Sequence, residues 1–117
     1  MRVLFVGEKR SAKAVEMNVT WKDRRLASKH LFDAFESLGV NTDEFKFCNE
    51  LEPSVVLVAE AIITNTPIVA MGRIAQKELS KMGVSYHAMI HPAARGRIRN
   101  KQRYAAHVRE VLKEVNS

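Results

Sequence analysis

Three polar residues follow short apolar runs of the chain, and their side chains are of types that act on substrates. Glu8 comes directly after one such run, Asn49 after another and His91 after a third. A carboxylate, an amide and an imidazole can orient water, read a hydrogen-bonding edge and donate a hydrogen bond. Each residue alone has an ordinary structural explanation as a turn or strand-end residue. Their joint placement is what makes them a candidate site, because a site needs several converging polar groups.

The elements that must position these residues alternate between strand and helix. Apolar, β-branched or aromatic runs that end at Gly or polar residues predict strands, and apolar residues recurring every three to four positions predict helices. The run from 53 to 63 is apolar nearly all round, and Pro53 at its first turn favours a helix. The predicted strands cover 2–6, 44–48, 67–71 and 84–90, and the predicted helices cover 23–38, 53–63, 73–82 and 99–115, with a loop at 12–22.

This alternation predicts a single α/β domain over residues 1–117. We expect a three-layer α/β/α sandwich around a four-stranded parallel sheet of order 2-1-3-4. Ligands of such sheets bind beyond the carboxyl ends of the strands. Glu8, Asn49 and His91 would therefore share one edge, together with Gly72, which leads into the helix at 73–82. In that helix we expect Ile74, Ala75, Leu79 and Met82 to face inward.

The charge of the chain favours a polyanionic partner such as nucleic acid. The sequence has 19 basic and 13 acidic residues, a net charge of +6. Six Lys or Arg and no acid lie between Arg95 and Arg109, so this stretch accounts for the whole positive excess. A basic surface of this kind attracts phosphate by a sequence-independent, salt-dependent term.

Several classes of site and location are excluded or disfavoured. The single cysteine, Cys48, allows no intrachain disulfide and no all-cysteine cluster, and we expect it to be buried at a strand end. His30, His87 and His107 lack metal-ligand spacing, and we place His107 on the polar side of the last helix, so we predict no metal and no cofactor. No glycine-rich nucleotide motif is present. No apolar run reaches a membrane span, and the N-terminus predicts a strand and not a signal peptide, so we expect a cytoplasmic protein. We also expect a monomer.

Four motifs in order resemble the uracil-DNA glycosylase superfamily, over about residues 3 to 112. The strand-then-Gly-Glu motif of that family is similar to Phe5–Ser11, FVGEKRS, and its base-reading strand to Lys46–Glu50, KFCNE. Its strand–Gly–helix step is similar to Ile68–Leu79, IVAMGRIAQKEL. Its His-Pro loop, which enters the minor groove, is similar to His91–Arg97, HPAARGR.

The resemblance implies base flipping and hydrolysis of an N-glycosidic bond in DNA repair. His91 would donate a hydrogen bond to the uracil O2 as charge develops there, and Glu8 would orient water or stabilise the sugar cation. Asn49 would read the base edge, with Gly7 beside it. Trp21 would stack on the base, although packing in the core explains this residue equally well. The DNA contacts implied are Pro92, Ala94, Arg95, Arg97, Arg99, Lys101 and Arg103.

The chain departs from the family pattern in composition and length. Lys9-Arg10-Ser11 stands where the family has small-Pro-Gly, and Ala93 stands where it has Ser. The cysteines of the iron–sulfur branch are absent, and the chain is shorter than typical members. Two alternatives therefore stay open. One is a non-catalytic DNA-binding protein on the same fold, and the other is an N-glycosidase or deoxyribosyltransferase of free nucleotides.

Overall fold

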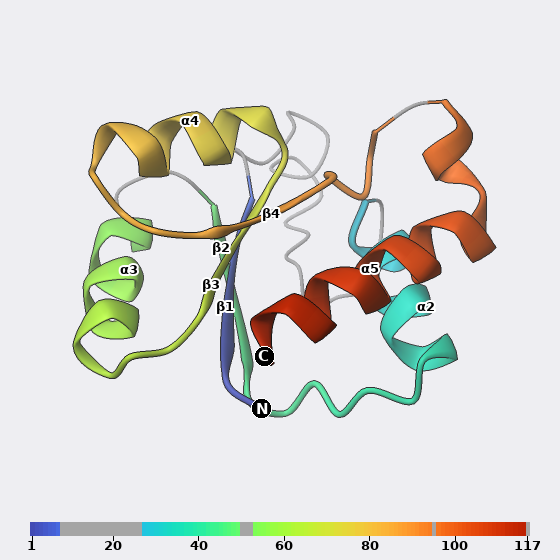
Figure 1. Ribbon diagram of the computed structural model, residues 1–117, viewed down its shortest axis with the longest axis horizontal. Coiled ribbons are helices and arrows are strands. Elements are labelled where there is room, and N and C mark those ends of the chain that lie inside the picture. Colours follow the sequence, from blue (N-terminus) through green and yellow to red (C-terminus); the bar gives the residue numbers. More distant parts are fainter. Residues whose placement is uncertain (8–26, 50–52, 95, 117) are drawn as a thin grey trace.

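The fold is a four-stranded parallel sheet with helices on both faces (Figure 1). The computed structural model describes residues 1–7, 27–49, 53–94 and 96–116. Neighbouring strands pair in the order β2-β1-β3-β4, so the predicted fold class and strand order are confirmed. The elements are β1 (Val3–Gly7), α2 (Ala27–Ser37), β2 (Phe45–Asn49), α3 (Pro53–Ile63), β3 (Ile68–Met71), α4 (Arg73–Lys81), β4 (His87–Met89), the short 3₁₀ helix η2 (Arg97–Arg99) and α5 (Lys101–Val115).

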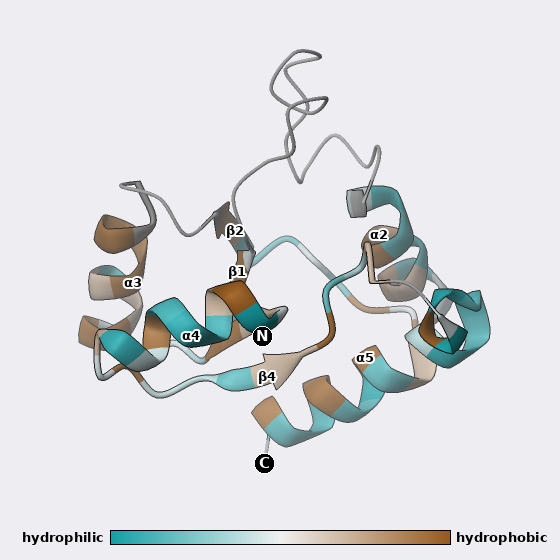
Figure 2. Ribbon diagram, turned by 90° about the horizontal axis from the view of Figure 1, so that it is seen from above, coloured by the Kyte–Doolittle hydropathy of each residue, from teal (hydrophilic) through white to brown (hydrophobic). Residues whose placement is uncertain are grey.

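The sheet separates two hydrophobic cores, and β1 contributes to both. Because successive side chains of a strand point to opposite faces, Val3 and Phe5 pack under α2 and α5, and Leu4 and Val6 pack under α3 and α4. All five residues of β1 are buried. Figure 2 shows the two pairs of helices on opposite sides of the sheet. Cys48 lies in the second core, as expected from the sequence.

Three sequence predictions about the second half of the chain were wrong in detail. Ile74 and Met82 are 51% and 49% exposed, because α4 buries only the narrow stripe of Ala75 and Leu79 against the sheet. The fourth strand is reduced to β4, since it pairs only with the short β3. The last helix begins at Lys101, because the Asn100 side chain accepts hydrogen bonds from the backbone N–H groups of residues 102 and 103 and caps it.

The most apolar of the described helices, α3, is a surface helix. Only Val58 and Ala61 are buried among the residues whose side chains the structure describes there, and Ile63 is 84% exposed. Figure 2 shows hydrophobic residues over much of α3. Within the described ranges, no helix combines the length and apolar character that crossing a membrane requires.

A buried nitrogen atom lies between the two helices of the first core. The ring of His30 on α2 stacks on Tyr104 of α5, with ring centroids 4.5 Å apart. The Nε2 atom of His30 is buried and has no hydrogen-bond partner among the described residues. Burial of a polar atom without a partner lowers the free energy of unfolding by about 1–3 kcal/mol.

We predict that His30→Phe stabilises the protein, because it keeps the stacked ring and removes the unpaired nitrogen. The free energy of unfolding should rise by about 1 kcal/mol, and the Tm by about 4 °C, in thermal melts followed by circular dichroism. His30→Ala, which loses the ring contact as well, should lower the Tm. A His30→Phe variant that melts at or below the wild-type temperature would contradict this explanation.

Candidate functional site

The site lies where the strands of the parallel sheet end. β1 ends at Gly7, which pairs with Asn49 at the end of β2, and β3 leads directly into Gly72. His91 follows two residues after the end of β4. Asn49 therefore ends one outer strand and His91 follows the other, and these two strands are about 14 Å apart at the usual strand spacing. The upper ends of the strands in Figure 1 show this edge.

The His91 side chain is held by the turn that it begins. The Ala94 N–H donates to the backbone oxygen of His91 at 2.9 Å, and the Ala93 N–H donates to the Nδ1 atom of His91 at 3.0 Å. Pro92 is buried within this turn. An Nδ1 atom that accepts a hydrogen bond carries no proton, so the neutral ring has its proton on Nε2. The turn thus makes Nε2 of His91 a hydrogen-bond donor.

The strand–glycine–helix step supports the His91 turn from one side. Gly72 has φ 92° and ψ 165°, a region that essentially only glycine occupies. A Cβ atom at this position would lie 3.1 Å from the Cβ atom of His91. The Gly72 N–H donates to the Met89 oxygen at 2.8 Å, and the Gln76 side chain donates to the same oxygen at 3.3 Å. The end of β4 is therefore bound to the start of α4.

Helix α5 supports the turn from the other side, through Ile90. The Tyr104 hydroxyl donates to the Ile90 oxygen at 3.0 Å, and the Ile90 N–H donates to the Nε2 atom of His107 at 2.9 Å. Burial raises the pKa of the Tyr104 hydroxyl, which therefore stays protonated as a donor. Desolvation lowers the pKa of His107, which favours the neutral ring that can accept a hydrogen bond.

Sequence reasoning missed the part that His107 plays. We expected it on the polar side of the last helix, among arginines. It is instead half-buried, one helical turn from Tyr104, with both side chains directed at one residue of the chain. The spacing of Tyr104 and His107, three positions apart on a helix, could have indicated that the two side chains lie on the same side of it.

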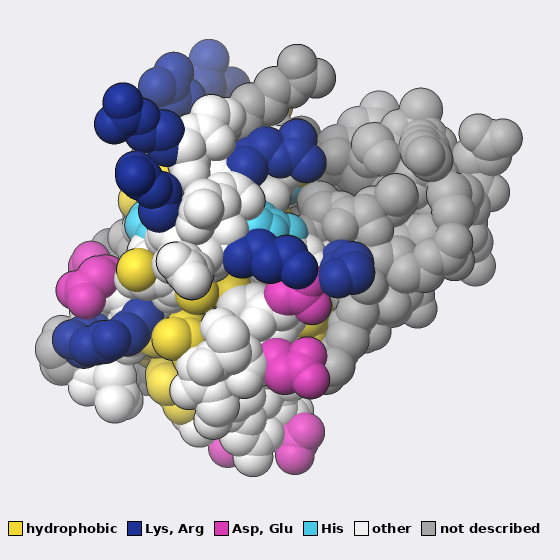
Figure 3. Space-filling view, turned by 90° about the vertical axis from the view of Figure 1, so that its right-hand side faces the viewer, with side chains coloured by type: hydrophobic (Ala, Val, Ile, Leu, Met, Phe, Trp, Pro, Cys, Tyr) yellow, Lys and Arg dark blue, Asp and Glu magenta, His cyan; other side chains and the backbone are white. Residues whose placement is uncertain are grey.

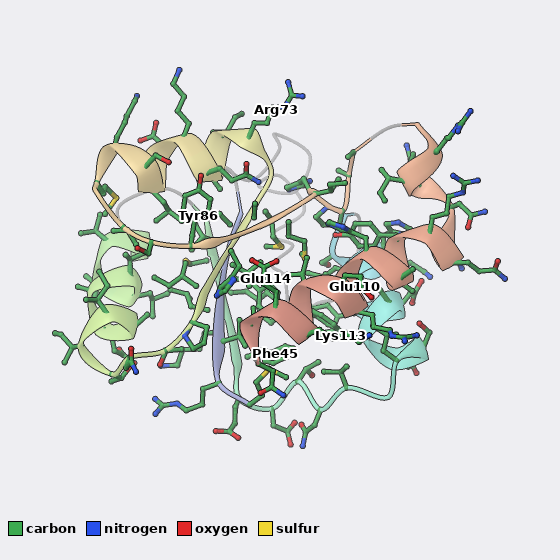
Figure 4. The ribbon with its side chains drawn as sticks, in the orientation of Figure 1. Phe45, Arg73, Tyr86, Glu110, Lys113 and Glu114 are labelled. Atoms are coloured by element: carbon green, nitrogen blue, oxygen red, sulfur yellow. The ribbon has the colours of Figure 1, made fainter. Side chains whose placement is uncertain are left out.

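A hollow of about 680 Å³ opens beside His91, within the size range of small-molecule sites. It has apolar walls and a few polar groups. Arg73, at the start of α4, extends away from the sheet at its rim (Figure 4). Its lining comes from three places, which are residues 72–74 and 76 at the start of α4, residues 88–91, 93 and 94 around the turn, and His107.

A basic face adjoins the turn, formed by η2 and α5. In Figure 3, Lys and Arg side chains gather around the visible His rings, and acidic side chains lie mainly below them. Within the described part of the chain, this face makes one ion pair, between Lys101 and Asp33 of α2 at 3.9 Å. The basic face consists of the exposed side chains Arg97, Arg99, Lys101, Arg103 and Arg109.

Part of the predicted site lies outside the described residues. Glu8, Trp21 and Arg95 fall there, and of Asn49 only the backbone position is described. Gly7 is buried at the end of β1, and Ala94 is half-buried in the turn. No three His, Cys, Asp or Glu side chains of the described ranges group closely enough to hold a metal ion.

Comparison with known proteins finds no matching family model and no significant similarity to a curated protein. The resemblance to uracil-DNA glycosylases therefore rests on the four motifs. The geometry of the His91 turn and of the sheet edge does not depend on that resemblance.

We predict that Gly72→Ala displaces the His91 ring. The added Cβ would meet His91 in a backbone conformation that alanine rarely adopts, so stability should fall by about 1–3 kcal/mol and the ring resonances of His91 should shift in NMR spectra. Gly83→Ala is the matched control, because Gly83 also has a positive φ, of 70°, but faces open space. Unchanged His91 resonances in Gly72→Ala, or equal shifts in both variants, would rule out direct support of His91 by Gly72.

Proposed function

We propose that this protein is a DNA glycosylase that hydrolyses the N-glycosidic bond of a flipped-out uracil or modified pyrimidine. The observation that carries the proposal is the His91 imidazole at the carboxyl edge of the sheet, whose Nδ1 atom accepts from the Ala93 N–H and whose Nε2 atom is thereby the donor. A hollow of suitable size lies next to it, and the basic face adjoins it. These features support a site that accepts one base while the surrounding surface binds phosphate.

Cleavage of the N-glycosidic bond requires a hydrogen-bond donor that stabilises negative charge on the base. As the bond from C1′ to the base breaks, its electron pair moves onto the base, and charge develops on the pyrimidine oxygens. A hydrogen bond from Nε2 of His91 stabilises that charge without a full proton transfer. Water then forms the new bond at C1′ and gives up a proton, for which Glu8 is the proposed acceptor. The departing base takes a proton from solvent.

We assign recognition of the base and contact with the surrounding DNA to separate parts of the edge. The Asn49 amide, with one donor and one acceptor group, suits the polar edge of a pyrimidine. The target bond is out of reach within a stacked duplex, so the base must leave the stack. Ala94 is half-buried whereas Pro92 is buried, so we assign Ala94, and not Pro92, to the gap that the base leaves.

The first test is cleavage of single- and double-stranded DNA that contains uracil. We expect abasic product from the wild-type protein, and a loss of about 100-fold or more in kcat for His91→Ala, because removal of one such donor costs about that much. Glu8→Gln and Asn49→Ala should also lose activity. His87→Ala is the matched control, because His87 begins β4, four residues before His91, and pairs with Glu114 of α5, at 3.1 Å.

Each other outcome points to a different function. Activity that survives all three substitutions would remove the proposed site. Tight, salt-sensitive binding without abasic product would favour a non-catalytic DNA-binding protein. Release of uracil from the free nucleotide, but not from DNA, would favour a nucleotide N-glycosidase.

The second test concerns the basic face. If Arg97 and Arg103 contact phosphates, each Ala substitution should weaken DNA binding and reduce the slope of log affinity against log salt by about 0.7–0.9. Lys113→Ala is the control, because Lys113 lies at the other end of α5 beside Glu110, at 3.6 Å (Figure 4). A salt slope that neither arginine substitution changes would place the DNA elsewhere on the protein.

A further inference from the structure

Ile90 depends on α5 for both of its backbone hydrogen bonds. It lies one residue beyond β4 and one residue before His91. The Tyr104 hydroxyl binds its carbonyl oxygen, and the Nε2 atom of His107 binds its N–H group. The position of Ile90 is therefore set by two side chains one turn apart on a helix, and the path of the chain into His91 follows from it.

The hydrogen bonds of His91 and His107 require opposite tautomers of the two rings. His91 accepts at Nδ1, so its proton is on Nε2. His107 accepts at Nε2, so its proton is on Nδ1. Protonation of His107 would remove the lone pair that binds Ile90 and would set two N–H groups against each other. Its bond to Ile90 exists only in the neutral form.

We propose that His107 is a positioning residue, which holds Ile90 and thereby His91 in place while its ring is neutral and releases them when the ring takes up a proton. The hydrogen bond between His107 and Ile90 is observed in the structure, whereas its effect on catalysis rests on the proposed glycosylase function.

Desolvation opposes the cationic form of His107, and the charged and titratable groups around it are of both signs. His91 and Arg73 line the same hollow, and Tyr104 lies with its ring centroid 6.2 Å away. Arg103 and Glu110 are one turn away along α5. From α2 the titratable group is His30, stacked on Tyr104, and from β4 it is His87, which pairs with Glu114.

The expected direction of the pH effect follows from linkage. The pKa of His107 is lowered in the fold from its ordinary value of 6.5, so the unfolded chain takes up this proton first as pH falls. The contribution of His107 is complete above about pH 6.5 and is lost as pH falls from there to the lower pKa of the folded state. The hold on His91 is a property of the folded protein, so it should be lost as pH falls through the lowered pKa of His107 in the folded state.

NMR of the ¹⁵N-labelled full chain tests the contact without reference to activity. At pH 7.5 we expect a scalar coupling across the hydrogen bond from the Ile90 N–H to His107, and ring nitrogen shifts of an unprotonated Nε2. On acidification the coupling should disappear and the exchange protection of the Ile90 amide should fall about tenfold. A protonated Nε2 at pH 7.5, or Ile90 protection that does not change with pH, would overturn the proposal.

Two variants separate the hydrogen bond from packing. The side-chain oxygen of His107→Gln can accept from the Ile90 N–H but does not titrate, so Ile90 protection should persist at acidic pH. His107→Leu offers no acceptor, so protection should be low at every pH and the His91 resonances should shift. Equal Ile90 protection in all three proteins would refute the proposal, and the wild-type titration tests it even if His107→Leu does not fold.

Activity provides the second readout. With uracil-containing DNA, His107→Leu should lower kcat several-fold with little change in KM, and His107→Gln should restore kcat and extend the pH profile to lower pH. Unchanged kcat in His107→Leu would overturn the positioning role in catalysis. If no variant, the wild type included, forms abasic product, then the glycosylase function fails, and the NMR results still decide whether His107 holds Ile90.

Discussion

The burial of β1 on both faces is the constraint from which the rest of the structure follows. All five of its residues are buried, with alternate side chains in two separate cores, so helices must cover both faces of the sheet. Parallel strands covered in this way leave their carboxyl ends open at a common edge. Gly7, Asn49, Gly72 and the chain into His91 lie along that edge. The candidate site is thus a consequence of how the core is divided.

Within that edge, elements from both sides of the sheet meet at three consecutive residues. Gly72 and Gln76 bind the carbonyl group of Met89, and α5 binds both backbone groups of Ile90. The His91 turn then orients its own imidazole through a backbone N–H group. A side chain on a loop is held to a defined direction in this way by rigid elements on either side, as preorganised donors in active sites require.

The fold, and the position of the candidate site at the sheet edge, could be predicted from the sequence. The side-chain contacts that support the site could not. Apolar runs and helical spacing predicted all the strands and long helices now described, and strand ends predicted the edge. The inward faces were harder, because Ile74 and Met82 satisfy helical spacing while the sheet has room only for Ala75 and Leu79. His107 was misplaced because its burial depends on the path of residues 88–91, which no local pattern encodes. Asn100 was an available capping signal that the periodicity alone overlooked.

The shortness of β4 has a consequence for association between chains. An edge strand exposes unpaired backbone groups that another chain can join, and a longer strand offers more of them. β4 has only three residues. At its end, Ile90 has both backbone groups occupied by Tyr104 and His107, and Pro92 follows without an N–H group. Strand addition at this side of the sheet is therefore discouraged, and the edge that carries the candidate site is kept from aggregating through its own backbone.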